Sequence, residues 1–239
     1  MRCNAERLIE ALIAAQLMEM QRQHKKKTEA RPCVVTVSRG FGSMGKEVAQ
    51  LLADTLEVRC CDRYILQEVA RRAHMDEDLV KVLDEHVSNF DKHWWQKLLG
   101  RKDTFSQEDY YHHLVKVVLS ISRTGGVIVG RGANIILGPE RAFRVRITGS
   151  LAPCSERIAD REDIELADAR KCVVDKNRER AAYILNLYNA DIDDTSLYDL
   201  VINSDRYNSE QVVEIILVAM RNAGQSLPED ALGSLRSHE

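Results

Sequence analysis

The stretch "VVTVSRGFGSMGKEVAQLLA", residues 34–53, decides how the rest of the chain is interpreted. A β-branched apolar run leads into a glycine-rich turn, and a helical pattern with one apolar side follows the turn. Gly40, four further residues, Gly45 and Lys46 have the spacing of a phosphate-binding loop, in which backbone N–H groups and a helix N-terminus hold a phosphate. Together with Gly42, these glycines allow the positive φ angles that such a loop needs.

Residue 47 departs from the usual pattern of such a loop. Ser or Thr normally follows the lysine and binds Mg²⁺ through its hydroxyl, whereas this chain has Glu47. The Glu47 carboxylate is also a suitable Mg²⁺ ligand, directly or through water, although its charge repels a phosphate. The loop therefore predicts phosphate binding and leaves the reaction open. A plain strand-to-helix glycine turn is the alternative.

Apolar runs alternate with helical patterns along the chain. Strands are expected at residues 33–38, 57–62, 125–130, 142–148 and 198–203. Helices are expected at 46–56, 64–74, 76–87, 107–123, 153–189 with a break near Glu162-Asp163, and from a cap at Ser209 to about residue 222. This order predicts a three-layer α/β domain with a mostly parallel sheet. In such a sheet, ligands gather at the carboxyl ends of the strands.

Composition narrows the functional classes. The chain has 239 residues, of which 44% are apolar and 30% charged, and a net charge of −3. This balance gives no general attraction to nucleic acid or to a membrane surface. The six cysteines include no C-x-x-C pair, so we expect neither a disulfide framework nor a structural zinc site. A cytoplasmic protein with reduced thiols is the expectation.

Residues 8–20 are the most apolar part of the N-terminal region. They are too few to cross a membrane, and Glu10 and Glu19 interrupt them. Their apolar residues recur at helical spacing, which predicts an amphipathic helix within an N-terminal extension, residues 1–30. Such a helix packs on the domain or on a second subunit, so a homo-oligomer formed through it is one expectation.

A stretch rich in arginine follows the strand expected at 142–148. Phosphoryl transfer needs cations around the transferring group, and helical segments here carry Arg157, Arg161, Lys171, Arg178 and Arg180, with Asp175 among them. Carboxylates are interleaved with these cations. On composition alone, a salt-bridged surface helix is slightly the better interpretation.

Six segments, in order, resemble the cytidylate kinase-like family, a branch of the P-loop nucleoside monophosphate kinases. They lie between about residues 33 and 222 and read "TVSRGFGSMGKEVAQLLA", "CCDRYIL", "VIVGRGANIIL", "VRITGSLAPCSERIADRE", "DKNRERAAYI" and "YDLVINSDRYN". The resemblance implies a P-loop kinase fold with a five-stranded parallel core. It also implies transfer of the γ-phosphoryl group of ATP, with Mg²⁺, to a small nucleotide, most simply CMP or dCMP.

The resemblance also divides the chain. It implies a kinase-like domain at residues 31–223, with a helical acceptor-binding insert at about 62–123 and an Arg-rich lid at about 153–190. Residues 224–239 are expected to form a flexible tail. No nucleic acid or membrane partner is expected.

The family motifs assign roles to individual residues. The ATP site would comprise Gly40, Phe41, Gly42, Ser43, Met44, Gly45, Lys46 and Glu47, with Ser204 and Arg206 beside the adenine and Glu47 also on the metal. The acceptor site would comprise Asp62, Arg63, Arg131 and Lys171. Catalysis would depend on Lys46, Arg157, Arg161, Asp175 and Arg178. Because this branch commonly has Glu after the basic residue, Glu47 fits a working site.

Two departures keep alternatives open. Authentic cytidylate kinases have aspartates on both sides of the arginine that matches Arg131, whereas this chain has Gly130 and Gly132. The alternatives are a nucleotide-binding regulatory protein without turnover and a kinase of another small-molecule acceptor. Trp94 and Trp95 either line the acceptor pocket or pack in a core.

Overall fold

A single parallel sheet organises the described part of the chain. The computed structural model describes residues 32–62 and 107–228, and also positions 65, 67, 68, 71 and 231. The strands are β1 (Val34–Arg39), β2 (Cys60–Cys61), β3 (Gly126–Val129), β4 (Phe143–Thr148) and β5 (Leu200–Asn203). They lie in the order β2-β3-β1-β4-β5, and every strand pair in these ranges is parallel. The predicted α/β fold class is confirmed.

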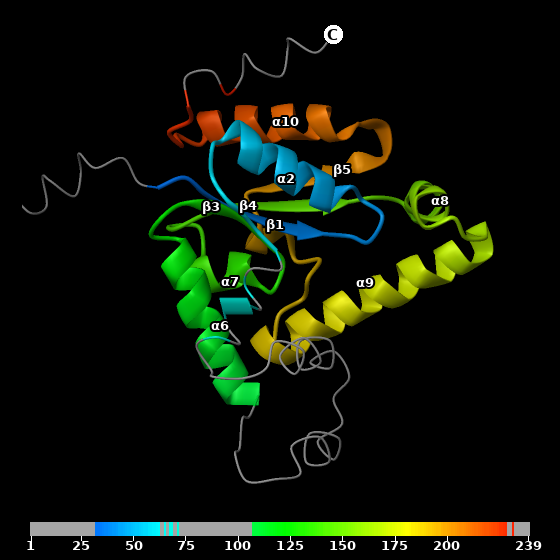
Figure 1. The fold of residues 1–239 in the computed structure, drawn as a ribbon, viewed down its shortest axis with the longest axis horizontal. Helices are drawn as coiled ribbons and strands as arrows, with labels where there is room; N and C mark the ends of the chain where they lie inside the picture. The colour runs from blue at the N-terminus through cyan, green and yellow to red at the C-terminus, as the bar shows by residue number, and fades with distance from the viewer. Residues whose placement is uncertain are drawn as a thin grey trace, which may run out of the picture. The chain divides into compact units, whose positions relative to one another are not determined.

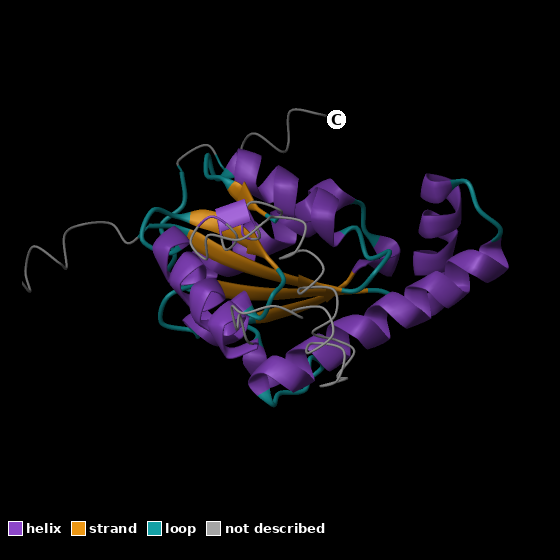
Figure 2. Cartoon of the chain, turned by 60° about the horizontal axis from the view of Figure 1, so that its bottom comes forward, coloured by secondary structure: helices purple, strands orange, loops and turns teal. Residues whose placement is uncertain are grey.

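Helices cover both faces of this sheet, as Figures 1 and 2 show. The described helices are α2 (Gly45–Thr55), α6 (Gln107–Ile121), α7 (Ala133–Leu137), α8 (Leu151–Glu162), α9 (Leu166–Tyr188) and α10 (Ser209–Asn222). Helices α2 and α10 lie on one face, and α6 and α7 lie on the other. Within the described residues, we find no helix that combines the length and the hydrophobicity needed to cross a membrane.

A hydrophobic core lies on each face of the sheet, and the alternation of side chains along the strands explains why there are two. Val35 and Val37 of β1 pack with α2 and α10, whereas Val34 packs with α6 and α7. Successive side chains of a strand point to opposite faces, and a strand covered on both faces is apolar at every position. The continuous run "VVTV" therefore forms the central strand of the sheet.

Helices α8 and α9 form a hairpin beyond the carboxyl ends of β1 and β4 (Figure 1). Asp163, with φ 52°, ends α8 in the left-handed conformation, which confirms the break predicted near this residue. Cys154 and Ile158 of α8 pack on Ala169 and Val173 of α9. This small core is separate from the two cores that flank the sheet, and it holds the hairpin together.

Some predicted boundaries were wrong. The strand expected at 57–62 has two residues, because Glu57 adopts φ 55° and the Val58 N–H bonds the Ala53 carbonyl to close α2. Helix α10 is capped by Asn208 instead of Ser209, in a reciprocal capping box with Gln211. Helix α7 was not predicted, since five residues are too few to show a helical period.

Several predictions concern residues outside the described ranges. These are the N-terminal extension 1–30, the helix at 76–87, Trp94 and Trp95, and most of the helix at 64–74, of which positions 65, 67, 68 and 71 are described and helical. Of the expected flexible tail at 224–239, Leu227 packs against the core on the α2 side and Ala231 is buried. The proposed domain limits, the oligomer and the cytoplasmic location stay predictions.

Candidate active site

The glycine-rich loop between β1 and α2 is fixed to the neighbouring strand β4. The Gly40 N–H donates to the Ile147 carbonyl at 2.8 Å. The Ser43 hydroxyl, fully buried, lies 3.0 Å from the Gly40 carbonyl and 3.1 Å from the Ile147 carbonyl. The Ser43 side chain therefore shapes the loop, and only its backbone is left for a ligand.

Two glycines of the loop are required by close contacts. A Cβ at Gly42, which has φ +80°, would lie 2.5 Å from the Cys154 carbonyl oxygen. A Cβ at Gly45 would lie 2.4 Å from the Cβ of Arg39. Met44, which lies between these two glycines in the chain, adopts the left-handed conformation, and α2 begins at Gly45. The loop thus turns sharply onto a helix N-terminus, where unpaired N–H groups and the helix dipole favour an anion.

A cavity of about 360 Å³, which we call the loop cavity, opens over this turn. It is lined by residues 39–47 together with Asp62, Arg161, Glu162 and Arg180. Lys46 and Glu47, in the first turn of α2, are exposed to it. Arg161 Nη1 lies 4.0 Å from Glu47 Oε1. The cavity therefore has the N–H groups and cations that a polyphosphate needs, and three carboxylates close to them, those of Glu47, Asp62 and Glu162.

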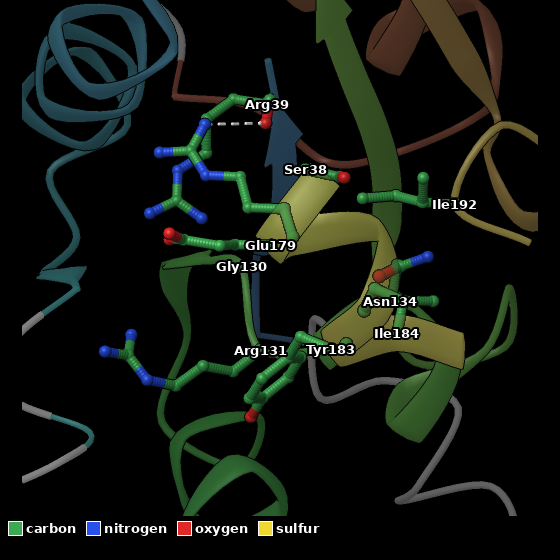
Figure 3. Close-up of a pocket in the computed structure, with 11 residues that line it drawn as sticks. Ser38, Arg39, Gly130, Arg131, Asn134, Glu179, Tyr183, Ile184 and Ile192 are labelled. Carbon is green, nitrogen blue, oxygen red and sulfur yellow. Dashed lines mark hydrogen bonds between the residues drawn. The ribbon is translucent and has the colours of Figure 1, made fainter. Parts of the chain in front are cut away.

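A second cavity of about 170 Å³, which we call the α9 cavity, lies between the ends of β1 and β3 and helix α9. Figure 3 shows Arg39, Arg131 and Glu179 pointing toward one side of it. Its remaining lining residues are Ser38, Gly130, Gly132, Asn134, Arg180, Tyr183, Ile184 and Ile192. The cavity thus combines charged groups on one side with apolar and amide groups on the other.

Asp62 connects the ends of three neighbouring strands. Arg131 Nη1 donates to the Asp62 backbone carbonyl at 3.1 Å and lies 3.5 Å from the Asp62 carboxylate. Arg39 Nη2 lies 3.8 Å from the same carboxylate. The Tyr188 hydroxyl donates to the Arg131 carbonyl at 2.5 Å, which ties the end of α9 to the turn after β3. Predicted acceptor-site residues from distant segments therefore meet here.

The helical hairpin contacts the loop at Phe41. The guanidinium groups of Arg161 and Arg180 lie 5.6 Å and 5.4 Å from the centre of the Phe41 ring. The Phe41 N–H donates to Asn177 Oδ1 at 2.7 Å, and Arg180 Nη1 donates to the Arg39 carbonyl at 3.1 Å. Helices α8 and α9 therefore both hold the loop.

Burial perturbs the Arg180 guanidinium. Burial, followed by the charge of Arg39, lowers the pKa of the Arg180 guanidinium to about 9. Both causes disfavour the charged form, so an anion beside Arg180 would be stabilised by it more strongly than in water.

The other predicted residues are divided between the cavities and the surrounding structure. Arg157 lies behind the loop, where it donates to the Ser204 carbonyl at 2.8 Å and to the Gly42 carbonyl at 3.3 Å. Arg178, 74% exposed, pairs with Asp175 on α9. Six of the predicted site residues that the structure describes line neither cavity: Arg157, Lys171, Asp175, Arg178, Ser204 and Arg206. Arg63 lies outside the described residues.

Sequence reasoning missed Arg39 and Asn177 as site residues, and it named Arg180 only as one of several arginines after β4, without a role of its own. Val173, Asn177, Arg180 and Ile184 are spaced by four, three and four residues, which is one side of a helix. Val173 and Ile184 are buried, so this side faces inward. The helical period of the apolar residues could have identified Asn177 and Arg180. No comparable pattern marks Arg39.

The loop cavity fits Mg²⁺ held together with a nucleotide. The described residues contain no group of three or more His, Cys, Asp or Glu side chains that could enclose a metal ion. Mg²⁺ is typically held by one or two carboxylates and by substrate phosphates. Glu47 and Asp62 both line the loop cavity and could supply these carboxylates.

Comparisons with known proteins agree with this geometry. Residues 34–206 match the family model described as the cytidylate kinase-like family. A cytidylate kinase of Methanosarcina barkeri is 28% identical over 188 residues, covering 78% of this chain and 95% of the relative. A cytidylate kinase of Methanocaldococcus jannaschii is 24% identical over 195 residues, covering 79% of this chain and 98% of the relative.

A solved structure shares the fold. The crystal structure of an uncharacterized protein from Eubacterium ventriosum superposes with a TM-score of 0.59 at 19% sequence identity. The match covers 79% of this chain and 98% of that protein. At this identity, the similarity concerns the fold alone.

Proposed function

The chain belongs to the cytidylate kinase-like family and is an ATP-dependent nucleotide kinase, and we propose that its acceptor is CMP or dCMP. The single observation that carries the proposal is the pair of adjoining cavities: a glycine-rich loop with Lys46 forms one, and Arg131 lines the other. The two relatives described above, each covered over almost its whole length, are named cytidylate kinases. Their name supports the choice of acceptor.

The two cavities would receive the two substrates. We place the phosphates of ATP in the loop cavity, against the N–H groups at the start of α2 and the Lys46 ammonium. The acceptor phosphate would lie toward Arg131 and the Asp62 turn. Glu47, with Asp62 nearby, would hold Mg²⁺, which supplies positive charge that the phosphates of ATP require.

The reaction is then a direct transfer. An oxygen of the acceptor phosphate attacks the γ-phosphorus of ATP. A new P–O bond forms as the bond to the bridging oxygen of ADP breaks. Lys46 and Arg161 line the cavity where negative charge spreads over the transferring group, so they would stabilise the transition state. The role of the loop and of the cations is positioning and charge stabilisation.

The test is ADP release from MgATP with each nucleoside monophosphate in turn. Wild type is compared with Lys46→Ala, and ATP binding is measured separately by calorimetry. Turnover that appears with CMP or dCMP and is lost in the variant is the expected result. Turnover with a different monophosphate would refute the proposed acceptor. If ATP binds and no monophosphate raises ADP release, the chain is a nucleotide-binding protein without this activity.

A further inference from the structure

The two cavities meet at a pair of arginines. Among the residues that the structure describes, Arg39 and Arg180 line both the loop cavity and the α9 cavity. Arg39 is the last residue of β1, directly before the loop, and Arg180 comes from α9. Their side chains therefore lie where the two proposed substrates would approach each other.

Guanidinium groups gather at this junction. Arg39 and Arg131 both lie near the Asp62 carboxylate, at 3.8 Å and 3.5 Å. Arg180 lines both cavities with Arg39, and Arg131 lines the α9 cavity. Guanidinium groups form strong, charge-assisted hydrogen bonds with phosphate oxygens, so this junction suits the phosphate of a monoester.

Gly130 leaves the space that the Arg39 guanidinium occupies. A Cβ built on Gly130 would lie 2.1 Å from Arg39 Nη1 and 3.2 Å from its Cζ. Gly130 also has φ +73°, which disfavours a side chain. The Arg39 side chain and the turn after β3 are therefore matched to each other, although they lie far apart in the sequence.

We propose that Arg39 is a further catalytic residue, which binds the acceptor phosphate and the transferring phosphoryl group at the junction of the two cavities, and that Gly130 keeps its guanidinium there. The proposal rests on the proposed kinase function and adds a specific contact to it. A guanidinium donates several hydrogen bonds in one plane and can therefore contact two phosphate groups at once. An ammonium has a shorter reach and no planar fork.

The main test replaces the Arg39 guanidinium and separates the two substrates kinetically. Arg39→Met should lower kcat by about 10²-fold and raise the KM for CMP by about 10-fold, with a change of less than about threefold in the KM for ATP. Arg39→Lys should recover part of this loss. Arg144→Met is the matched control, because Arg144 is also partly buried and paired, with Asp199 at 2.7 Å, and lines neither cavity among the described residues.

The second test asks whether Gly130 acts through Arg39. In the wild-type background, Gly130→Ala should displace the Arg39 guanidinium and raise the KM for CMP. When Gly130→Ala is added to the Arg39→Met variant, the KM for CMP should not rise further. Gly138→Ala is the control for backbone strain, because Gly138 has a similar φ of +62° and nothing within 4 Å of the added Cβ. Melting curves of all variants show which of them fold.

The outcomes are distinct. If wild type is active and Arg39→Met keeps its kcat and its KM for CMP, this role of Arg39 is wrong and the kinase function stands. Independent, multiplicative effects of Gly130→Ala and Arg39→Met would overturn the role of Gly130. If wild type itself turns over no monophosphate, the proposed function fails, and this inference fails with it.

Discussion

The glycine-rich loop and the α8–α9 hairpin both reach the site, but they differ in how the sequence encodes them. The loop consists of consecutive residues whose spacing is itself the functional pattern. The hairpin contributes Arg161, Asn177 and Arg180, and which of its many charged residues face inward depends on how α9 packs. Function is therefore encoded locally in one region and by tertiary structure in the other.

The largest expected effect tests the local region. Lys46→Ala should lower kcat/KM for ATP by about 10²- to 10³-fold, because it removes the cation that lies in the loop cavity next to the helix N-terminus. Steady-state kinetics with MgATP measure this change. A variant with wild-type kinetics would show that the loop is not a phosphate site. The statement that the local sequence of the loop encodes function would then be wrong.

The next test asks how independent the loop is of the hairpin. Gly42→Ala places a methyl group 2.5 Å from the Cys154 carbonyl oxygen of α8, so either the loop or the helix must move. We expect a loss of about 2 kcal/mol in the free energy of unfolding and weaker ATP binding. Gly224→Ala is the control, with φ +77° and nothing within 4 Å of the added Cβ. Equal effects of the two substitutions would mean that backbone strain alone matters.

A smaller effect distinguishes the two sides of α9. Asn177→Ala removes the acceptor of the Phe41 N–H and should lower kcat/KM for ATP by about fivefold, equivalent to about 1 kcal/mol for one hydrogen bond. Arg178→Ala, at the next position and 74% exposed, should change it by less than about twofold. The reverse ranking would show that α9 turns when nucleotide binds, and that the role predicted for Arg178 from the sequence applies to that state.

The smallest expected effect concerns the stability of the protein and leaves its activity unchanged. Asn208→Ala removes the cap of α10 and should lower the free energy of unfolding by about 1 kcal/mol without changing kcat. Ser209→Ala, at the position predicted as the cap, should cost much less. Urea unfolding of both variants measures the difference. If Ser209→Ala proves the more harmful, the capping box with Gln211 does not form in solution.

The same distinction explains what could be predicted from the sequence. The strands β1, β3, β4 and β5 were found within two residues, because their apolar runs are bounded by turn signals. Asp62 and Arg131 were assigned to the acceptor site from short family motifs. These predictions depend on residues close together in the chain.

Features that depend on distant residues were not predicted. Arg39 has no pattern around it, and its position becomes meaningful only when the turn at Gly130 is placed beside it. In the sequence, Gly130 and Gly132 stand where authentic cytidylate kinases have aspartates. In the structure, a Cβ at Gly132 would lie 2.2 Å from the Tyr188 ring, so the glycine makes room for a side chain of α9.

The bonds from Gly40 and Ser43 to Ile147 also affect how the protein folds. Ser43 and Ile147 are 104 residues apart in the chain, and β1 pairs in parallel with β4 over Val35–Arg39. Closing so long a segment costs chain entropy before any contact repays it. The loop therefore cannot take its final shape until β4 has joined the sheet. Phosphate binding should stabilise only chains that have completed this step, so nucleotide added during refolding would trap the finished fold without speeding the early stages.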